Sequence, residues 1–194
     1  MNQSYFQKDI DIIAAALASV DTQVFEQLVA QVCTALGSGG KVILTGVGKN
    51  FPVCQKVADS MQSIGLQVFA LNAFDALHGS IGIIGEKDLL IVLSKSGETK
   101  ELITLLCAAK GKAKTFLITF SRESTLVGMT DSQIAMDLAA EGDLWNIIPN
   151  NSTAACLILL QAMATQVQKH LGLDLHKDFL EHHPGGNIGA EAAL

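Results

Sequence analysis

Residues 89–99 have the sequence LLIVLSKSGET. Their first half, Leu89–Leu93, is a continuous apolar run of the kind found in strands buried on both faces of a sheet. Polar residues follow at Ser94–Thr99, and the pattern beyond them predicts a helix that ends near Lys110. A buried strand that leads through a short polar loop into a helix is the repeating unit of parallel sheets. This stretch therefore favours an α/β fold.

Similar strand and helix patterns extend on both sides of this stretch. Further strands are predicted at 41–45, 67–71 and 115–119, with a weaker one at 133–138. Helices are predicted at about 50–64, at about 152–171 and within residues 4–36, where Asp21 can start a second helix. Strands that alternate with helices predict a doubly wound, five-stranded parallel sheet flanked by helices, with a flavodoxin-like architecture.

Length, composition and charge narrow the class of protein. The 194 residues fit a single domain, with a helical N-terminal segment at 1–36 and an α/β core at 40–190. The net charge of −6 and the lack of a Lys/Arg cluster argue against nucleic-acid binding. No apolar run approaches the roughly 20 residues that span a membrane. The N-terminus lacks a signal-peptide layout and the scattered cysteines are typical of reduced thiols, so we expect a cytoplasmic protein without a membrane partner.

The loop Ser94–Thr99 is the strongest candidate for a binding site. Ser94, Ser96 and Thr99 supply three hydroxyl groups around Gly97, which lets the backbone approach a ligand closely. The start of the following helix adds unpaired N–H groups and a partial positive charge. Serine and threonine are also common helix caps for structural reasons alone. Three hydroxyls around a glycine after a buried strand nevertheless favour a phosphate site.

A second loop, at 46–50, has the sequence GVGKN. It is not a P-loop, because the pattern G-x-x-x-x-G-K-[ST] is absent. It also lacks the third glycine of a dinucleotide fingerprint, and no acidic residue ends the second strand. What remains is a tight turn that places Lys49 at the mouth of the sheet. From the residues alone, Lys49 is equally an exposed loop lysine or a functional one.

Together these segments resemble the SIS (sugar isomerase) family, and more narrowly its arabinose-5-phosphate isomerases. The similar motifs occur in family order and cover residues 40 to 190 approximately. They are GVGK at 46–49, LHGSIG at 77–82, LSKSGET at 93–99, Glu141 followed by PNNST at 149–153, and HPGGNIG at 183–189.

The resemblance implies an aldose–ketose isomerase that interconverts D-arabinose 5-phosphate and D-ribulose 5-phosphate through an enediolate. Arabinose 5-phosphate feeds synthesis of the eight-carbon acid Kdo, found in lipopolysaccharide and some capsules. The resemblance also implies a homotetramer whose active sites are shared between subunits, with a sugar phosphate as the small-molecule partner. The implied catalytic residues are Lys49, Glu98, Glu141 and His183. The implied substrate-binding residues are Gly48, His78, Ser94, Ser96 and Thr99.

The chain departs from the family pattern at several positions. Asn50 and Phe51 replace a Ser and a Gly, and the usual P-T-S-S-T is PNNST at 149–153. The tandem CBS domains that often follow are missing, which suggests an unregulated or separately regulated form. Two alternatives therefore stay open: an SIS isomerase of another sugar phosphate, and a non-catalytic sugar-phosphate-binding regulator.

The chemistry requires a base that removes a proton beside the carbonyl and a group that stabilises the enediolate oxygen. We expect Glu98 in the first turn of a helix, where the dipole lowers its pKa and suits an orienting role. Glu141 follows a strand and lies near Leu144, Trp145 and Ile147, where desolvation would raise its pKa, so we prefer Glu141 as the base. We assign ring opening or proton shuttling to His183, and enediolate stabilisation or binding of a sugar hydroxyl to Lys49.

No metal or other cofactor is expected for this reaction. The acidic and histidine residues between 174 and 183 are of types that bind metals, but their spacing fits no compact ligand motif. The isomerisation itself needs no metal, because a carboxylate, a cation and a histidine supply the required groups.

Overall fold

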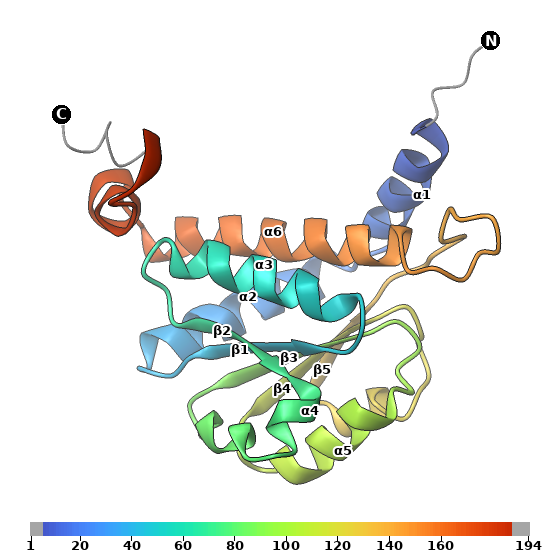
Figure 1. Cartoon of the computed structure of the whole chain (residues 1–194), viewed down its shortest axis with the longest axis horizontal. Coiled ribbons are helices and arrows are strands. Elements are labelled where there is room, and N and C mark those ends of the chain that lie inside the picture. Colours follow the sequence, from blue (N-terminus) through green and yellow to red (C-terminus); the bar gives the residue numbers. More distant parts are fainter. Residues whose placement is uncertain (1–5, 188–194) are drawn as a thin grey trace.

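Five short apolar segments of the chain form strands, and the segments between them form helices and turns. The computed structural model describes residues 6–187 (Figure 1). The strands are β1 (Val42–Gly46), β2 (Val68–Asn72), β3 (Leu89–Ser94), β4 (Lys114–Thr119) and β5 (Ser132–Ala135). The helices are α1 (Gln7–Ala18), α2 (Thr22–Gly37), α3 (Asn50–Gln62), α4 (Ala73–Ala76), α5 (Lys100–Ala109) and α6 (Asn151–Leu171). Shorter turns are η1 (Ser80–Ile83), η2 (Val127–Met129), η3 (Leu175–Phe179) and η4 (Leu180–His182).

The strands form one parallel sheet in the order β2-β1-β3-β4-β5. The doubly wound, five-stranded architecture expected from the sequence is confirmed. Each observed strand overlaps its expected range, and the weak candidate at 133–138 forms the shorter strand β5. The order reverses direction between β1 and β3. In open α/β sheets, ligands bind beyond the carboxyl ends of the strands at such a reversal.

Side chains of the central strands alternate between two hydrophobic cores. Val42 and Leu44 of β1 belong to the core that α2, α3 and α6 cover, whereas Ile43 faces the core beneath α4 and α5. Figure 1 shows α1, α2, α3 and α6 on one face of the sheet and α4 and α5 on the other. Burial on both faces explains why β1 and β3 read as continuous apolar runs rather than as alternating ones.

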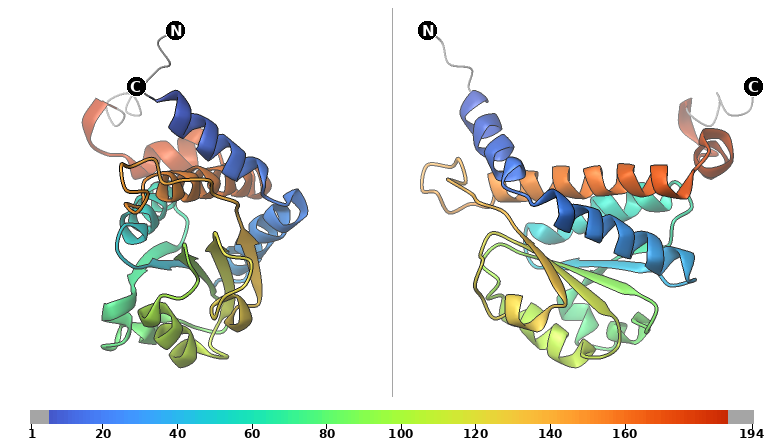
Figure 2. Two further views of the ribbon diagram at one scale, coloured as in Figure 1. Left: turned by 90° about the vertical axis from the view of Figure 1, so that its right-hand side faces the viewer. Right: turned by 180° about the vertical axis from the view of Figure 1, so that it is seen from behind.

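The N-terminal segment forms two helices, as expected. Asp21 caps α2, because its Oδ1 accepts hydrogen bonds from the backbone N–H of Gln23 at 2.8 Å and of Val24 at 3.4 Å. Helix α1 packs against α6 and extends past it at one end, while the segment after α6 lies at the other end (Figure 2). Residues 1–5 and 188–194, which include the last two residues of the HPGGNIG motif, lie outside the described part of the chain.

Within residues 6–187, no single helix is long and apolar enough to cross a membrane. The pair α1 and α2 passes that test only when taken together, with a bend of 78° between them.

Candidate active site

The loops after β1 and β3 lie side by side at the point where the strand order reverses. Gly46 at the end of β1 pairs in register with Leu93 of β3. The side-chain amide of Asn50 donates to the carbonyl of Leu93 at 3.4 Å, which links the two loops directly. A β-carbon on Gly46 would come within 2.8 Å of the Asn50 β-carbon, so this turn requires glycine. The fold therefore brings the GVGKN loop to the LSKSGET loop.

The Ser94–Thr99 loop is organised by its own hydroxyl groups. Ser94 Oγ lies 2.9 Å from Thr99 Oγ1 and accepts the backbone N–H of Gly97 at 3.1 Å. Ser96 Oγ accepts the backbone N–H of Glu98 at 3.2 Å. Ser94 is buried, whereas Ser96 is exposed and Thr99 half-buried. Ser94 thus supports the loop from within, and Ser96 and Thr99 lie nearer to solvent at the start of α5.

Gly97 has a backbone conformation that the loop depends on. Its φ of +68° lies in the left-handed region that favours glycine. A β-carbon at this position would also collide with the hydroxyl of Ser124, which belongs to the connection after β4. The glycine therefore lets the loops after β3 and β4 pack closely together.

The prediction that Glu98 lies in the first turn of a helix is wrong. Helix α5 begins at Lys100 with Thr99 as its N-cap, so Glu98 lies just before the helix. Both carboxylate oxygens are held by Thr125, through its hydroxyl and its backbone N–H, each at 2.7 Å. These hydrogen bonds lower the pKa of Glu98. The expected direction of the pKa shift is therefore right, but its main cause is Thr125, a residue of the next loop.

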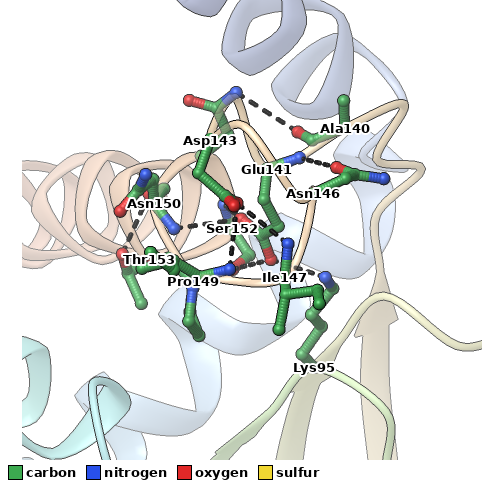
Figure 3. Close-up of polar contacts among 12 residues, drawn as sticks. Lys95, Ala140, Glu141, Asp143, Asn146, Ile147, Pro149, Asn150, Ser152 and Thr153 are labelled. Carbon is green, nitrogen blue, oxygen red and sulfur yellow. Dashed lines mark hydrogen bonds and ion pairs between the residues drawn. The ribbon is translucent and has the colours of Figure 1, made fainter.

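Glu141 is almost fully buried, at 1% exposed, and accepts four polar contacts (Figure 3). Its Oε1 lies 2.6 Å from Lys95 Nζ and accepts the Ser152 hydroxyl at 2.7 Å. Its Oε2 accepts the backbone N–H groups of Ser152 at 2.9 Å and Asn150 at 3.1 Å. Because Asn150, the N-cap residue of α6, makes no side-chain cap, the carboxylate of Glu141 serves in its place.

The expected rise in the pKa of Glu141 is wrong. Burial does raise it, but the hydrogen bonds from Lys95 and Ser152 and the charge of Lys95 outweigh burial and hold the pKa below its usual value. The apolar neighbours on which the expectation relied do not surround the carboxylate. Leu144, Trp145 and Ile147 are 89%, 67% and 73% exposed, on the outside of the loop.

The loop that carries Glu141 is folded by polar side chains. Asp143 accepts the backbone N–H groups of residues 145, 147 and 148, each at 2.9 Å. Asn146, at a φ of +57°, accepts the backbone N–H of Glu141 at 2.6 Å. The side-chain amide of Asn151 donates to Asp9 of α1 at 3.1 Å and to the carbonyl of Ala140 at 3.2 Å. Asn151, one departure from the family pattern, thus ties this loop to α1.

Three other predicted residues are exposed around this edge of the sheet. Lys49 occupies the N-cap position of α3, directly after Gly48, whose φ is +61°. His78 is exposed between α4 and η1, in the connection that follows the edge strand β2. Lys49 and Gly48 therefore lie beside the Ser94–Thr99 loop, while His78 lies further out along the sheet.

His183 does not join the other candidate residues within one chain. It follows α6, whereas Glu141 lies at the N-terminus of that helix, which has 21 residues and is thus about 30 Å long. Figure 1 shows the two segments at opposite ends of α6. The His183 ring contacts Phe179, with ring centroids 3.9 Å apart, and its Nδ1 lies 2.7 Å from the carbonyl oxygen of Phe179.

Sequence reasoning missed the partners of the two carboxylates. Lys95 stands within the LSKSGET motif, but its position between two serines did not mark it as a contact of Glu141. Ser152 was part of a quoted motif without an assigned role, and Thr125 carried no signal at all. In the described part of the chain, no cluster of three or more potential metal ligands occurs.

Comparison with known proteins is consistent with this geometry. The model of the SIS domain matches residues 36–166. The chain belongs to the SIS domain family. This part of the chain contains all five strands and both carboxylates, together with most of α6.

The chain is similar to curated members of this family and to solved structures. It is 31% identical to arabinose 5-phosphate isomerase KdsD of Yersinia pestis over 188 residues, covering 95% of this chain and 56% of that protein. It is 34% identical to arabinose 5-phosphate isomerase KpsF of Escherichia coli O6:H1 over 151 residues, covering 77% and 46%. The chain thus spans about half the length of the curated relatives it matches.

A solved structure of an E. coli CFT073 protein in complex with a sugar phosphate has the same fold. It aligns with a TM-score of 0.85 at 24% identity, over 92% of this chain and 94% of that one. The likeness extends over nearly all of both chains, which establishes that the whole SIS fold is present here.

Proposed function

We propose that the protein is an aldose–ketose isomerase that interconverts D-arabinose 5-phosphate and D-ribulose 5-phosphate. The observation that carries this proposal is the hydroxyl-lined loop at the reversal of strand order, with an ionised buried carboxylate and a lysine beside it. The names of curated relatives at 31% and 34% identity support the choice of sugar. In this role the protein would supply arabinose 5-phosphate for Kdo synthesis.

The residues around the loop suit the separate tasks of the reaction. Ser96 and Thr99, with the N-terminus of α5, bind the phosphate, and buried Ser94 keeps the loop in shape. Lys49 stabilises the enediolate oxygen or binds a sugar hydroxyl. Glu98, exposed and oriented by Thr125, binds and orients the sugar. Gly48 and His78 complete the substrate-binding set in this proposal.

Glu141 is the base in this scheme. Its lowered pKa keeps it ionised at neutral pH, which is the protonation state that can accept a proton. Because it is buried and held by four donors, one of these contacts must loosen for the carboxylate to reach substrate.

We further propose that His183 acts in the site of a neighbouring copy within a homotetramer, where it opens the sugar ring or shuttles a proton. Two features support this assembly. The segment after α6, which carries His183, lies at the opposite end of that helix from the loop that carries Glu141 (Figure 2). Beside Glu141, the side chains of Leu144, Trp145, Ile147 and Ile148 are exposed, and a second copy can cover them. The free cysteines Cys33, Cys54, Cys107 and Cys156 fit the cytoplasmic location that we also propose.

Conversion of arabinose 5-phosphate to ribulose 5-phosphate by the purified protein tests the function. The assay contains a chelator, and other aldose phosphates run in parallel. We expect turnover of arabinose 5-phosphate in the presence of chelator. If the protein turns over another sugar phosphate and not this one, that other sugar phosphate is its substrate. Binding of sugar phosphates, seen as a raised melting temperature without turnover, would instead support a regulator.

A further inference from the structure

Lys95 is the one residue of the Ser94–Thr99 loop whose side chain forms an ion pair in the described structure. Its backbone is fixed at the end of the sheet, because its carbonyl accepts the N–H of Phe120 at 3.0 Å and the hydroxyl of Thr119 at 3.2 Å. From this anchored position the side chain reaches Glu141 at 2.6 Å. The Lys95 side chain remains 44% exposed, so one face of it stays open to solvent or ligand.

Glu141 is anchored equally firmly from its own side. Its backbone N–H donates to Asn146 at 2.6 Å, and its carbonyl accepts the N–H of Asn151 at 3.3 Å. Its carboxylate also caps α6 through the N–H groups of Asn150 and Ser152. The Lys95–Glu141 pair therefore connects two fixed backbones, the Ser94–Thr99 loop after β3 and the N-terminus of α6.

Other titratable groups near Glu141 do not replace Lys95. Cys156 of α6 is buried, and burial together with the charge of Glu141 raises its pKa to about 12, so it stays neutral and adds no charge. Asp9 of α1 accepts a hydrogen bond from Asn151 and carries the wrong charge to stabilise a carboxylate. Asp143 of the same loop binds backbone N–H groups. Among the described residues, Lys95 is thus the cation that contacts Glu141.

We propose that Lys95 is a positioning residue that holds the Glu141 carboxylate in its charged form and couples it to the phosphate loop. This inference rests on the proposed function, because it assumes that Glu141 transfers the proton. Without the lysine, a phosphate dianion at the loop and the carboxylate would face each other as like charges. With it, one ammonium group neutralises the carboxylate while its exposed face remains available to the phosphate.

The pH dependence of kcat/KM for Lys95→Met tests this role, with Lys95→Arg as the rescue variant. Removing the cation raises the pKa of Glu141, so the acidic limb of the profile should move up by about one pH unit or more. Lys95→Arg should keep the wild-type limb. The phosphate of the substrate titrates at about pH 6 in the profiles of wild type and variants alike. Only the difference between these profiles therefore reports on Glu141. An unmoved limb in Lys95→Met overturns the proposal.

Lys41→Met is the matched control. Lys41 pairs with buried Asp88 at the same 2.6 Å, but at the amino ends of β1 and β3, away from the candidate site. This variant should unfold at a lower temperature and keep the wild-type pH profile. If it shifts the acidic limb as much as Lys95→Met does, the effect comes from lost stability, and the proposal is overturned.

A measurement without substrate tests the coupling itself. Thermal unfolding at neutral pH is compared for wild type, Lys95→Met, Glu141→Gln and the double variant. Lys95→Met should lower the midpoint in the wild-type background and change it far less when Glu141 is already replaced. An equal decrease in both backgrounds shows that Lys95 does not act through Glu141 and overturns the proposal. Should Lys95→Met not fold, Lys95→Gln takes its place as an uncharged hydrogen-bond donor.

The failures of the two proposals can be told apart. If the wild type turns over another sugar phosphate, only the substrate is reassigned, and the profiles are measured with that sugar. If no sugar phosphate is turned over, the role of Lys95 in catalysis is overturned together with the enzymatic function. The unfolding measurements then identify the ion pair as a purely structural contact.

Discussion

Two ion pairs of the same length lie at opposite ends of the sheet. Lys41 and Asp88 meet at the amino ends of β1 and β3, and Lys95 and Glu141 meet beyond the carboxyl ends, each pair at 2.6 Å. In both, the carboxylate is buried while the lysine side chain is partly exposed, at 29% and 44%. By length and burial alone, nothing separates them.

The two pairs differ in what they connect. Asp88 accepts the backbone N–H groups of Lys41 and Gly85, at 2.9 and 2.8 Å, so it closes turns beside strands that are already hydrogen-bonded to each other. Glu141 instead joins the Ser94–Thr99 loop to the start of α6. A buried ion pair is therefore not by itself a sign of function. Its place at the carboxyl edge, beside the reversal of strand order, is what makes the second pair a candidate for function.

The largest difference between the two ends should appear when each carboxylate becomes an amide. Glu141→Gln removes the proposed base, and we expect kcat to fall by about 10²- to 10⁴-fold. Asp88→Asn should lower stability and leave kcat of the folded protein near wild type. Steady-state kinetics at a temperature where both variants are folded makes the comparison. Equal losses of kcat would contradict the functional distinction between the two ends.

His183 should also affect the carboxyl-edge site, but from another copy. His183→Ala and Glu141→Gln should each be nearly inactive alone. When the two variants are dissociated, mixed in equal amounts and reassembled, we expect roughly a quarter of the wild-type activity. Random assembly gives that fraction of the shared sites an intact Glu141 from one chain and an intact His183 from its neighbour. A mixture that stays inactive, although mass spectrometry of the intact oligomers shows that the two variants have mixed, would place both residues in the same chain's site or remove His183 from the mechanism.

The amino-edge pair should show itself in stability and in its dependence on pH. Burial raises the pKa of Asp88, but hydrogen bonds from Lys41 and Gly85 outweigh burial and lower it. We expect Lys41→Met to cost about 1–3 kcal/mol at neutral pH, below the range for fully buried pairs because Lys41 is partly exposed. Because the pKa of Asp88 is lower in the folded than in the unfolded protein, the ionised carboxylate stabilises the fold at pH values above its unfolded pKa of about 4. This stabilisation is lost as the pH falls through the pKa of the folded state.

Urea unfolding of Lys41→Met and wild type between neutral and acidic pH measures this contribution. The difference in free energy of unfolding should be constant near neutral pH and shrink at acidic pH, once Asp88 is protonated in both proteins. A difference that does not change with pH would show that Lys41 stabilises the fold through packing of its methylene groups and not through Asp88.

The smallest expected effect concerns one hydroxyl of the phosphate loop. Ser96→Ala removes an exposed hydroxyl, and we expect KM to rise by roughly 10-fold, as for one lost hydrogen bond to a charged group. The fold should be unchanged, since Ser96 accepts only a local N–H bond from Glu98. Ser38→Ala, which removes a hydroxyl bonded to Ala35 at the end of α2, is the control. Identical KM values for both variants would remove Ser96 from the phosphate site.

Most of the fold was predictable from local patterns. The apolar runs at β1, β3 and β4 are buried on both faces, and such runs mark strands regardless of where the neighbouring strands lie. Asp21 marked the start of α2 because a cap acts on N–H groups two and three residues away. The short helix α4 was missed, since four residues are too few to show a periodicity.

The site was predictable only in part. The hydroxyl groups of Ser94 and Ser96 bond to partners at most five positions away, so a short stretch was enough to predict an anion site in this loop. The pKa of Glu141 could not be predicted from the sequence, because it depends on Lys95, which is remote from Glu141 in the chain. The apolar residues next to Glu141 in the chain pointed to a raised pKa, yet their side chains face outward.

By itself, the sequence determined the α/β elements, the parallel sheet and the polar loop Ser94–Thr99 between a strand and a helix, because strand burial, helix capping and turn chemistry act over a few residues. Only the tertiary structure decided that Lys95 pairs with Glu141, that Thr125 holds Glu98, and that His183 lies at the other end of α6. Charge interactions act through space and not along the chain. The partner of a buried carboxylate is therefore known only when the loops beyond the strands have been placed side by side.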